Sequence, residues 1–432
     1  MAILLIKESR SKRYQTVTIF AILLVQPMWR LWYCWEGMIN MKIKTKQLSK
    51  YKRFFDLKIE LGENPKRIIA LVGPNGCGKS SVFDGLMYLY SRYYFVGSTG
   101  FRDYNYHSLL GNPGYSNDEN SINVQFDTGS LYDIYVRRQS SGSEKSIFSL
   151  RSPFRYNANL MIGDLRTVDD IKNNKIGASL TSDLDQKIED NYRRLNIKYN
   201  KYLNEKDVRP SEAKQHIIGE LNSFLQKCLD LNIDNLGDIE SGRGTLFFKK
   251  HDYNSTFTFN NLSAGEKEVV DIILDLYMRK DDYNDSVFLI DEPELHINTS
   301  IQRKLLSVIN SLIRDNCQIW IATHSIGFLR ALQEELRSES SIIEFKGDNN
   351  WASQEYVLTP IIPNRNTWNS IFSTALDDLT NMISPKTIIY CEGRAELTTD
   401  GLREALMRKF TIQYSLLNIQ THYLFQVVGI RN

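Results

Sequence analysis

Cysteine is scarce in this sequence, and the five cysteines among its 432 residues lie far apart. They stand at positions 34, 77, 228, 317 and 391, and no two of them form a C-x-x-C pair. This spacing argues against a disulfide scaffold and against a cysteine zinc site. Unpaired thiols suit a reducing compartment, so we expect a cytoplasmic protein.

The sequence also lacks an excess of charge of either sign. Its 53 Lys and Arg residues against 51 Asp and Glu residues give a formal net charge of +2. This balance excludes a global polycation, so any contact with nucleic acid must come from a local patch. The hydrophobic fraction of 42% and the charged fraction of 24% are ordinary for a globular protein. The length allows roughly two to four domains or lobes.

No apolar run is long enough to span a membrane. The best candidate is residues 16–25 (TVTIFAILLV), which follow the basic pair Lys12-Arg13. A bilayer span needs about 20 apolar residues, and we therefore expect no membrane partner. A targeting segment is one interpretation of this stretch. Because it fits no targeting class well, we expect instead that residues 1–40 are a non-native or mis-called extension ahead of a start at Met41.

After Met41, strand patterns alternate with helix patterns, which predicts an α/β fold with a parallel sheet and βαβ crossovers. The predicted strands are 42–48, 56–61, 67–72, 121–126, 131–139, 286–290, 318–322, 341–345 and 387–391, with further short strands from Thr245. The predicted helices are 79–93, 264–277, 299–313, 327–336 and 367–382. Residues 97–120 and 346–366 are predicted to be loops.

Residues 183–231 change to a purely helical pattern. Apolar residues recur at spacings of three and four on both sides of Pro210, which predicts two antiparallel helices with one apolar seam each. At 1.5 Å per residue, each helix would reach roughly 30 Å from its base. An ordinary helical lobe is the alternative interpretation.

The strongest local signal is a glycine-rich turn between a predicted apolar strand and a predicted helix. Its residues, with the one that follows, are Gly73, Pro74, Asn75, Gly76, Cys77, Gly78, Lys79, Ser80 and Ser81. The turn matches G-x-x-x-x-G-K-[ST], in which curled backbone N–H groups and a helix N-terminus bind phosphate oxygens. We expect Lys79 to reach the β- and γ-phosphates of a nucleotide and Ser80 to ligate Mg²⁺.

Polar residues follow two later strands of the predicted sheet. Asp291 and Glu292 come directly after one apolar strand, and His324 follows the next. In a phosphate-binding-loop fold this edge of the sheet faces the phosphates. We expect Asp291 to hold Mg²⁺, directly or through water, and Glu292 to orient and deprotonate the attacking water. We expect His324 to hydrogen-bond the γ-phosphate or that water.

Together these residues resemble the ABC-type P-loop ATPases of the SMC-like, RecF-like and OLD-like branch. The resemblance covers residues 41–345, with the Walker A motif at 73–80 and the Walker B motif at 287–292. Between and after them stand the signature sequence Leu-Ser-Ala-Gly-Glu at 262–266 and a D-loop at 294–298. The family fold is an ABC ATPase head with an antiparallel β lobe, and here the short helical hairpin would be an insertion.

The resemblance implies ATP and Mg²⁺ as cofactors and two copies that sandwich two ATP molecules head to tail. Ser263, Gly265 and Glu266 would then contact the ATP bound by a second copy, in a homodimer or a larger homo-oligomer. In this family a glutamine loop also contacts the metal, and Gln139 is the candidate here.

The resemblance also divides the chain into segments. The ATPase domain comprises 41–182 with Walker A and 232–345 with the signature, Walker B and the switch histidine, separated by the helical insertion 183–231. Residues 346–386 would form a linker and a helix, and 387–432 a TOPRIM-like stub.

The stub resembles the first strand and acidic loop of a TOPRIM nuclease domain. There Glu392 would be the metal-binding acid, with Glu396 assisting. No D-x-D follows, and one carboxylate is not enough to fix two hard cations. We therefore expect no nuclease activity from this chain alone, and we expect the last ~35 residues to reflect a truncation or frame shift, because a lone strand has no partner to bury it. A further edge strand of the ATPase domain is the alternative interpretation of 387–391.

The function expected from the resemblance is Mg²⁺-dependent ATP hydrolysis that gates a nuclease effector in antiphage defence. The effector would be a TOPRIM-type partner or fused domain, and DNA is a further candidate partner. Two alternatives stay open: a RecF-like repair ATPase that binds DNA directly, and the ATP-binding subunit of an ABC transporter. The helical insertion and the Glu266 signature argue against the transporter.

Overall fold

A computed structural model of the chain describes residues 41–94, 122–140, 145–164, 168–169, 171, 178–239, 241–250, 255–362, 364, 368 and 371–372. Several predictions concern residues outside these ranges: the extension 1–40 with its apolar run, the loop 97–120, the strand 387–391, and Glu392 and Glu396 of the TOPRIM-like stub. Of the helix predicted at 367–382, only Trp368, Ile371 and Phe372 lie inside them. No helix in the described ranges is long and apolar enough to cross a membrane.

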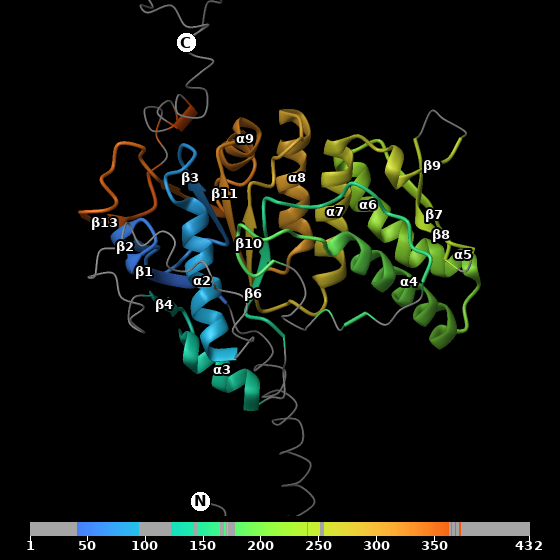
Figure 1. The fold of residues 1–432 in the computed structure, drawn as a ribbon, viewed down its shortest axis with the longest axis horizontal. Coiled ribbons are helices and arrows are strands. Elements are labelled where there is room, and N and C mark those ends of the chain that lie inside the picture. The colour runs from blue at the N-terminus through green and yellow to red at the C-terminus, as the bar shows by residue number, and fades with distance from the viewer. Residues whose placement is uncertain are drawn as a thin grey trace, which may run out of the picture. The chain divides into compact units, whose positions relative to one another are not determined.

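The central element is a parallel sheet of five strands in the order β12-β3-β11-β10-β6 (Figure 1). Its strands are β3 (Ile68–Val72), β6 (Phe148–Arg151), β10 (Val287–Asp291), β11 (Gln318–Thr323) and β12 (Ser340–Glu344). Every residue of β3, β6, β10 and β11 is buried. A parallel sheet covered on both faces explains why most of these strands are continuous apolar runs in the sequence.

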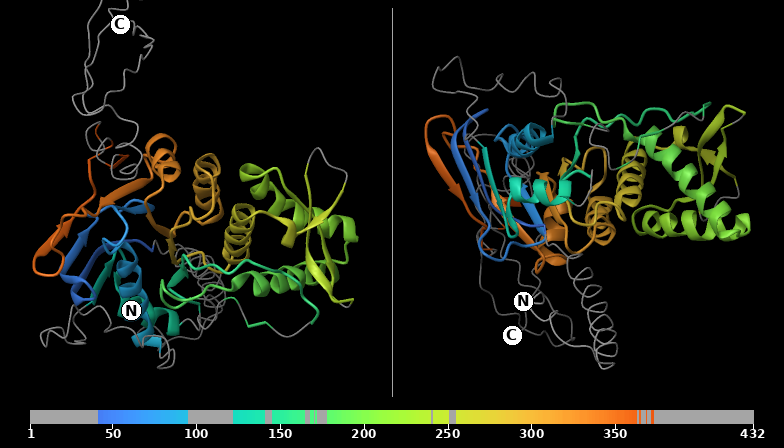
Figure 2. Two further views of the ribbon diagram at one scale, coloured as in Figure 1. Left: turned by 45° about the horizontal axis from the view of Figure 1, so that its top comes forward. Right: turned by 90° about the horizontal axis from the view of Figure 1, so that it is seen from below.

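The two faces of this sheet bury two different hydrophobic clusters. Along β3, Ile68 and Ala70 belong to one cluster, whereas Ile69 and Leu71 belong to the other, as the period of two of a strand requires. The first face is covered by α7 (Ala264–Arg279), α8 (Thr299–Leu312) and α9 (Ile326–Glu334). The second is covered by α2 (Lys79–Tyr94) and by a second sheet (Figure 2).

The second sheet has the order β13-β2-β1-β4-β5. Its strands are β1 (Ile43–Tyr51), β2 (Phe54–Glu60), β4 (Ile122–Phe126), β5 (Gly129–Ser130) and β13 (Glu355–Leu358). All pairs are antiparallel except β13 with β2. The prediction that 346–366 is a loop was therefore wrong at β13, an edge strand of four residues that owes its hydrogen bonds to β2.

The strand predicted at 131–139 was also wrong, because these residues form the helix α3 (Leu131–Ser140). Ser130, just before the helix, and Asp133, in its first turn, bond reciprocally. The Asp133 carboxylate accepts from the Ser130 N–H at 2.8 Å, and the Ser130 hydroxyl accepts from the Asp133 N–H at 3.2 Å. This capping arrangement starts a helix. Leu131 and Ile134 are then buried at helical spacing.

Residues between β6 and β10 of the central sheet form a lobe of helices and a small sheet. The helices are α4 (Lys187–Lys206), α5 (Pro210–Ala213), the π-helix η2 (Lys214–Ile218) and α6 (Gly219–Cys228), and η3 (Phe259–Asn261) is a 3₁₀ turn. The strands β7 (Asn232–Asp238), β8 (Arg243–Lys249) and β9 (Phe257–Thr258) are antiparallel.

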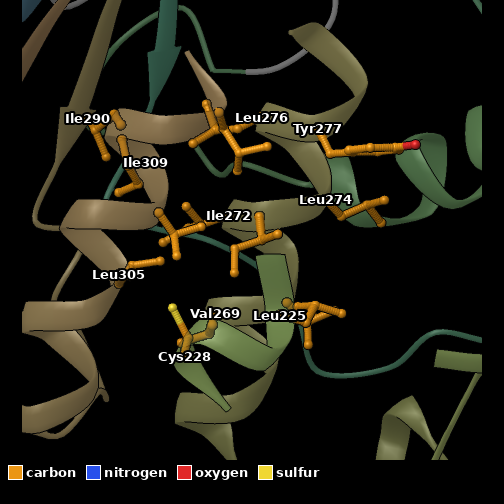
Figure 3. Close-up of a cluster of buried hydrophobic side chains, with 14 of the residues drawn as sticks. Leu225, Cys228, Val269, Ile272, Leu274, Leu276, Tyr277, Ile290, Leu305 and Ile309 are labelled. Atoms are coloured by element: carbon orange, nitrogen blue, oxygen red, sulfur yellow. The ribbon is translucent and has the colours of Figure 1, made fainter. Parts of the chain in front are cut away.

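The helices of this lobe pack against the helices that cover the central sheet. Leu225 and Cys228 of α6 belong to the same buried cluster as Val269 of α7 and Leu305 of α8 (Figure 3). The apolar seams therefore serve an ordinary packed lobe, which was the alternative interpretation of 183–231.

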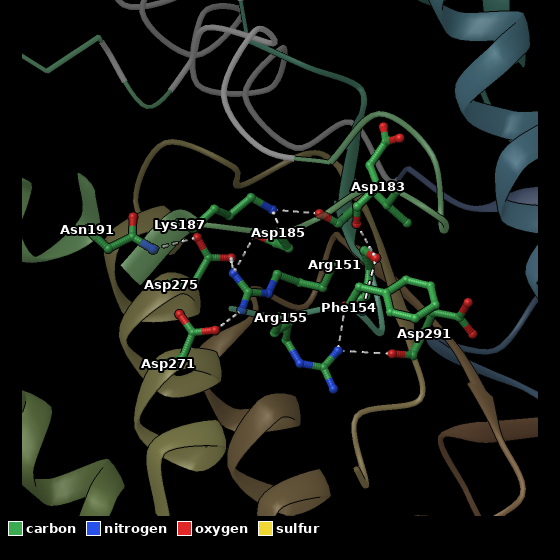
Figure 4. Close-up of polar contacts among 12 residues, drawn as sticks. Arg151, Phe154, Arg155, Asp183, Asp185, Lys187, Asn191, Asp271, Asp275 and Asp291 are labelled. Carbon is green, nitrogen blue, oxygen red and sulfur yellow. Dashed lines mark hydrogen bonds and ion pairs between the residues drawn. The ribbon is translucent and has the colours of Figure 1, made fainter. Parts of the chain in front are cut away.

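A buried group of charges joins this lobe to the central sheet (Figure 4). Arg151, at the end of β6, forms an ion pair with Asp271 of α7 and lies 3.5 Å from Asp185 and 3.6 Å from Asp275. Lys187 at the start of α4 lies 3.4 Å from Asp185. Burial raises the pKa of Asp271 to about 6. Removing one member would leave an uncompensated buried charge, at a cost of about 3–5 kcal/mol.

Candidate nucleotide-binding site

The parallel strands bring the predicted site residues to one edge of the central sheet. In the registers of the sheet, Thr323 of β11 lies beside Val72 of β3, and Ala322 lies beside Asp291 of β10. The glycine-rich turn, Asp291 and His324 thus all follow the carboxyl ends of neighbouring strands, which is where α/β sheets bind ligands. β11 separates the strand of the glycine-rich turn from the strand of Asp291.

The glycine-rich turn has the backbone of a phosphate-binding loop. Gly76 and Gly78 have φ angles of +76° and +106°, which side chains rarely adopt. A Cβ atom at Gly78 would also lie 2.5 Å from the Phe54 ring. Lys79 begins α2 and is buried, and its ammonium donates to the carbonyls of Gly73 at 2.8 Å and Pro74 at 3.0 Å. Its charge therefore lies within the loop that would surround a phosphate.

Asp291 carries a fully buried carboxylate beside the Ser80 hydroxyl. It has 0% exposed surface, and neither of its oxygens makes a hydrogen bond of normal geometry within the described part of the chain. Burial raises its pKa to about 7, although the nearby Ser80 hydroxyl opposes this rise. Unsatisfied buried oxygens require an explanation, and a hard divalent cation is the ligand that such oxygens fit.

Other carboxylates do not complete a metal cage here. Nowhere in the described ranges do three or more His, Cys, Asp or Glu side chains gather in a metal-binding group. Mg²⁺ characteristically binds through one or two protein ligands together with phosphates and water. Ser80 and Asp291 therefore suit Mg²⁺ that arrives with a nucleotide.

Glu292 has a strained backbone. Its φ angle is +44°, a conformation that costs a residue other than glycine about 1–3 kcal/mol and persists only where neighbours enforce it. Its N–H donates to the Ala322 carbonyl at 3.0 Å, and its own carbonyl accepts from Arg155 Nη2 at 2.8 Å. Its side chain is partly exposed, so water can reach the carboxylate.

His324 lies against a buried carboxylate that the sequence reasoning named only as part of the D-loop. Glu294 Oε1 accepts from the Thr323 hydroxyl at 2.7 Å and from the His324 N–H at 3.0 Å, and it lies 3.5 Å from His324 Nδ1. Burial raises the pKa of Glu294. This carboxylate holds the backbone of His324 and lies beside its imidazole. Only the position of Glu294 two residues after Glu292 could have indicated it.

The signature residues are at the N-terminus of α7. Ser263 is the exposed N-cap and forms a capping box with Glu266: its N–H donates to Glu266 Oε2 at 2.9 Å, and its hydroxyl accepts from the Glu266 N–H at 3.3 Å. A Cβ atom at Gly265 would lie 2.5 Å from the His296 carbonyl oxygen, so the signature packs on the D-loop.

The predicted nucleotide contact of Glu266 has a competing structural use. Its carboxylate serves the capping box and also accepts from Lys250 at 3.2 Å. Among the described residues, no hydrogen bond joins the signature to residues 73–81. The Ser263 N–H and hydroxyl both donate to the Glu266 carboxylate, so at this helix start it is the Gly265 N–H that is left for a phosphate other than one held by the Walker A loop of the same chain.

The structure does not bring Gln139, the predicted metal ligand, to this edge of the sheet. Gln139 is exposed on α3, and its amide bonds to the Tyr135 hydroxyl. Its neighbour Arg138 contacts Asp285, which precedes β10, whereas Asp291 ends that strand. Gln139 thus lies toward the opposite end of β10.

The strand β6 that leads to the site was not predicted, because it has only four residues and includes polar Ser149 and Arg151.

Two family models match the chain. Residues 102–330, more than half of the chain, match the family described as "AAA domain, putative AbiEii toxin, Type IV TA system", and residues 41–94 match a second family described as AAA domain. No curated protein matches the sequence.

Solved structures of SMC heads are similar at low identity. The SMC head domain from Thermotoga maritima shares 14% identity at a TM-score of 0.38, covering 75% of this chain and 100% of that one. An SMC head bound to the C-terminal winged-helix domain of ScpA shares 13% identity at 0.39, covering 76% and 99%. An SMC head with an extended coiled coil, bound to the C-terminal domain of ScpA derived from Pyrococcus furiosus, shares 12% at 0.36, covering 77% and 99%.

Proposed function

This chain belongs to the AAA domain family that its central residues match, and we propose that it is a Mg²⁺-dependent ATPase that acts as a head-to-tail dimer. One observation carries the proposal. The buried Asp291 carboxylate has no hydrogen-bond partner in the described part of the chain, and it lies on the sheet edge that holds the phosphate-binding loop. A cation accompanied by phosphates would satisfy it.

Each residue of the edge has a distinct task in the proposed reaction. Lys79 neutralises charge on the β- and γ-phosphates, and Ser80 and Asp291 hold the metal ion. Mg²⁺, when bound, offsets the negative charge that grows on the phosphate oxygens. His324, oriented by Glu294, hydrogen-bonds the γ-phosphate or the attacking water.

Glu292 acts as the base. As the water oxygen bonds to the γ-phosphorus, Glu292 accepts the proton that this water loses. The bond from the γ-phosphorus to the bridging oxygen breaks, and ADP leaves with that electron pair. The partly exposed side chain of Glu292 and its enforced backbone suit a group that must meet water in one orientation.

The dimer is proposed because the signature has no hydrogen bond to its own Walker A loop in the described ranges. The capping box of α7 uses the N–H groups of Ser263 and Glu266, and those of Ala264 and Gly265 at the start of this 16-residue helix are left to bind an anion. In a head-to-tail dimer this anion is the γ-phosphate held by the second copy.

We further propose that hydrolysis gates an effector, with a TOPRIM-type nuclease in antiphage defence as the favoured class. The family description names a toxin of a toxin–antitoxin system, which supports a defence setting. The resemblance of residues 387–396 to TOPRIM supports the nuclease.

Turnover of ATP by the purified chain tests the ATPase. Lys79→Ala should abolish Mg²⁺–ATP binding measured by calorimetry. Lys66→Ala should not, because Lys66 is exposed, its ammonium donates to the Ser338 carbonyl, and it precedes β3 whereas the phosphate-binding loop follows that strand. A Lys79→Ala variant that binds ATP normally would contradict the site.

Addition of duplex DNA at a series of salt concentrations then distinguishes a DNA-binding ATPase from one that gates a protein effector. Turnover that DNA stimulates and that salt suppresses would indicate direct DNA binding. Turnover that DNA leaves unchanged, but that a protein partner alters, would support the gated effector.

A further inference from the structure

We propose that Arg155 is a positioning residue that fixes the backbone of the catalytic Glu292 and ties it to the signature helix α7. The inference rests on the proposed ATPase function and deepens it. No motif in the sequence indicated Arg155, which lies in the irregular segment after β6.

The backbone on both sides of Arg155 is held in place. The Tyr156 N–H donates to the Asp185 carbonyl at 2.9 Å, and the Asp185 N–H donates to the Phe154 carbonyl at 2.8 Å. The side chain of Arg155 has 0% exposure, although its neighbours Phe154 and Tyr156 are 57% and 49% exposed. The segment thus directs one charged side chain inward between two exposed aromatic residues.

The guanidinium group spans the backbone of the catalytic strand end (Figure 4). Nη1 donates to the Ser152 carbonyl at 2.7 Å and to the Asp291 carbonyl at 3.1 Å, and Nη2 donates to the Glu292 carbonyl at 2.8 Å. A planar fork of donors holds such a set in one orientation. Arg155 thereby holds the peptide units of the proposed metal ligand and of the proposed base, where Glu292 has its φ of +44°.

The same side chain forms an ion pair with the signature helix. Arg155 Nε donates to Glu268 Oε1, and Asn157 Nδ2 donates to Glu268 Oε2 at 2.7 Å. Glu268 is buried in the second turn of α7, whose N-cap is Ser263 of the signature. A displacement of the start of α7 would therefore pull on the group that holds Glu292.

This link has a consequence for the proposed dimer. The signature of one copy would contact the ATP of the second copy, while Glu292 of that first copy acts on the ATP in its own Walker A loop. Arg155 lies between them and would couple occupancy of one ATP site to catalysis at the other. Such coupling is reciprocal for binding, so turnover should rise cooperatively with ATP concentration.

Substitution of Arg155 in the full chain tests the inference. In Arg155→Met, kcat should fall roughly 100-fold, because misplacement of a catalytic group by about 1 Å has that effect. ATP affinity should stay within about threefold, since Lys79 and Ser80 are untouched. Arg155→Lys should not rescue, because one ammonium is a poor substitute for the fork. Arg303→Met is the matched control, because Arg303 also forms ion pairs with carboxylates, but its partners Glu334 and Glu335 are exposed and neither belongs to the site.

A double variant separates positioning from folding. Arg155→Met alone leaves Glu268 as an unpaired buried charge, whereas Arg155→Met with Glu268→Leu removes both charges. We expect the double variant to melt near the wild-type temperature, to keep a slow kcat and to show a Hill coefficient of about 1.

The outcomes are distinguishable. The inference would be overturned if the double variant turned over ATP within about threefold of the wild-type rate and kept its cooperativity. The proposed ATPase function would be unaffected by that result. Absence of turnover in the wild-type protein would overturn the proposed function, and this inference with it.

Discussion

The substitution Asp291→Asn should stabilise the metal-free protein while destroying its response to Mg²⁺. Asp291 has 0% exposure, and both of its oxygens lack hydrogen-bond partners in the described ranges. Burial raises its pKa from an ordinary 3.8 to about 7. An ionised carboxylate at this point therefore opposes folding until a cation binds to it.

The size of the effect follows from the shift in pKa. A rise of about three pKa units corresponds to about 4 kcal/mol against the folded state once the pH exceeds both pKa values. Asn removes the charge, but its buried amide still lacks partners, at a cost of about 1–3 kcal/mol. The net gain in the free energy of unfolding should therefore be about 1–3 kcal/mol at pH 8.

The sign of the pH dependence provides a second check. Because the pKa of Asp291 is higher in the folded than in the unfolded state, its stabilising contribution is complete below about pH 4 and is lost as the pH rises through about 7. The advantage of Asp291→Asn over wild type should thus be small at pH 5 and largest at pH 8.

Denaturant unfolding in EDTA at pH 5 and pH 8 measures these differences. Asp285→Asn is the matched control, because Asp285 lies just before the start of β10 and forms ion pairs with Arg138 and Lys145. Loss of these ion pairs should not raise the free energy of unfolding. With Mg²⁺ and ATP, wild type should gain about 3 kcal/mol at a ligand concentration 100 times Kd, and Asp291→Asn should gain much less. Equal stability of the variant and wild type in EDTA at pH 8 would refute the reasoning.

Three further substitutions test neighbouring parts of the site. Glu294→Gln keeps an acceptor but removes the charge beside His324, so kcat should fall roughly 10- to 100-fold with unfolding unchanged; an unaltered kcat would remove Glu294 from the account. Gly265→Ala places a Cβ atom 2.5 Å from the His296 carbonyl, so both melting temperature and turnover should drop, and a variant as stable as wild type would contradict this packing. Ser263→Ala removes the N-cap, which should lower the free energy of unfolding by denaturant by about 1 kcal/mol. Turnover should fall by more than this loss of stability accounts for. Full turnover would mean that the hydroxyl does not contact a nucleotide.

Features that depend on local chemistry could be predicted from the sequence. The phosphate-binding loop needs only its glycines, Lys79 and the flanking strand and helix, and the structure has β3 and α2 there. The helix predicted at 264–277 is confirmed as α7, because Ser263 and Glu266 form a capping box that sequence spacing reveals. Because β10 and β11 are parallel neighbours, Asp291 and His324 lie at the same edge of the sheet, and the order of strands in the sequence is enough to predict this.

Features that depend on distant partners could not be predicted. Arg151 interrupts the apolar pattern of β6, and its partner Asp271 is 120 residues away. β13 is a strand because β2 offers it an edge. Arg155 belongs to no motif, and the sequence placed Glu294 only in the D-loop. The folded contacts with Glu268 and His324 give these two residues a role.

The oligomeric state of Glu292→Gln in the presence of ATP and Mg²⁺ tests the central claim most directly. Light scattering coupled to size exclusion should show an ATP-dependent dimer, and phosphate release should be abolished while ATP binding persists. Lys79→Ala in the same background should remove the dimer, because no nucleotide remains to be shared. Normal turnover by Glu292→Gln, or a monomer at saturating ATP, would contradict the account.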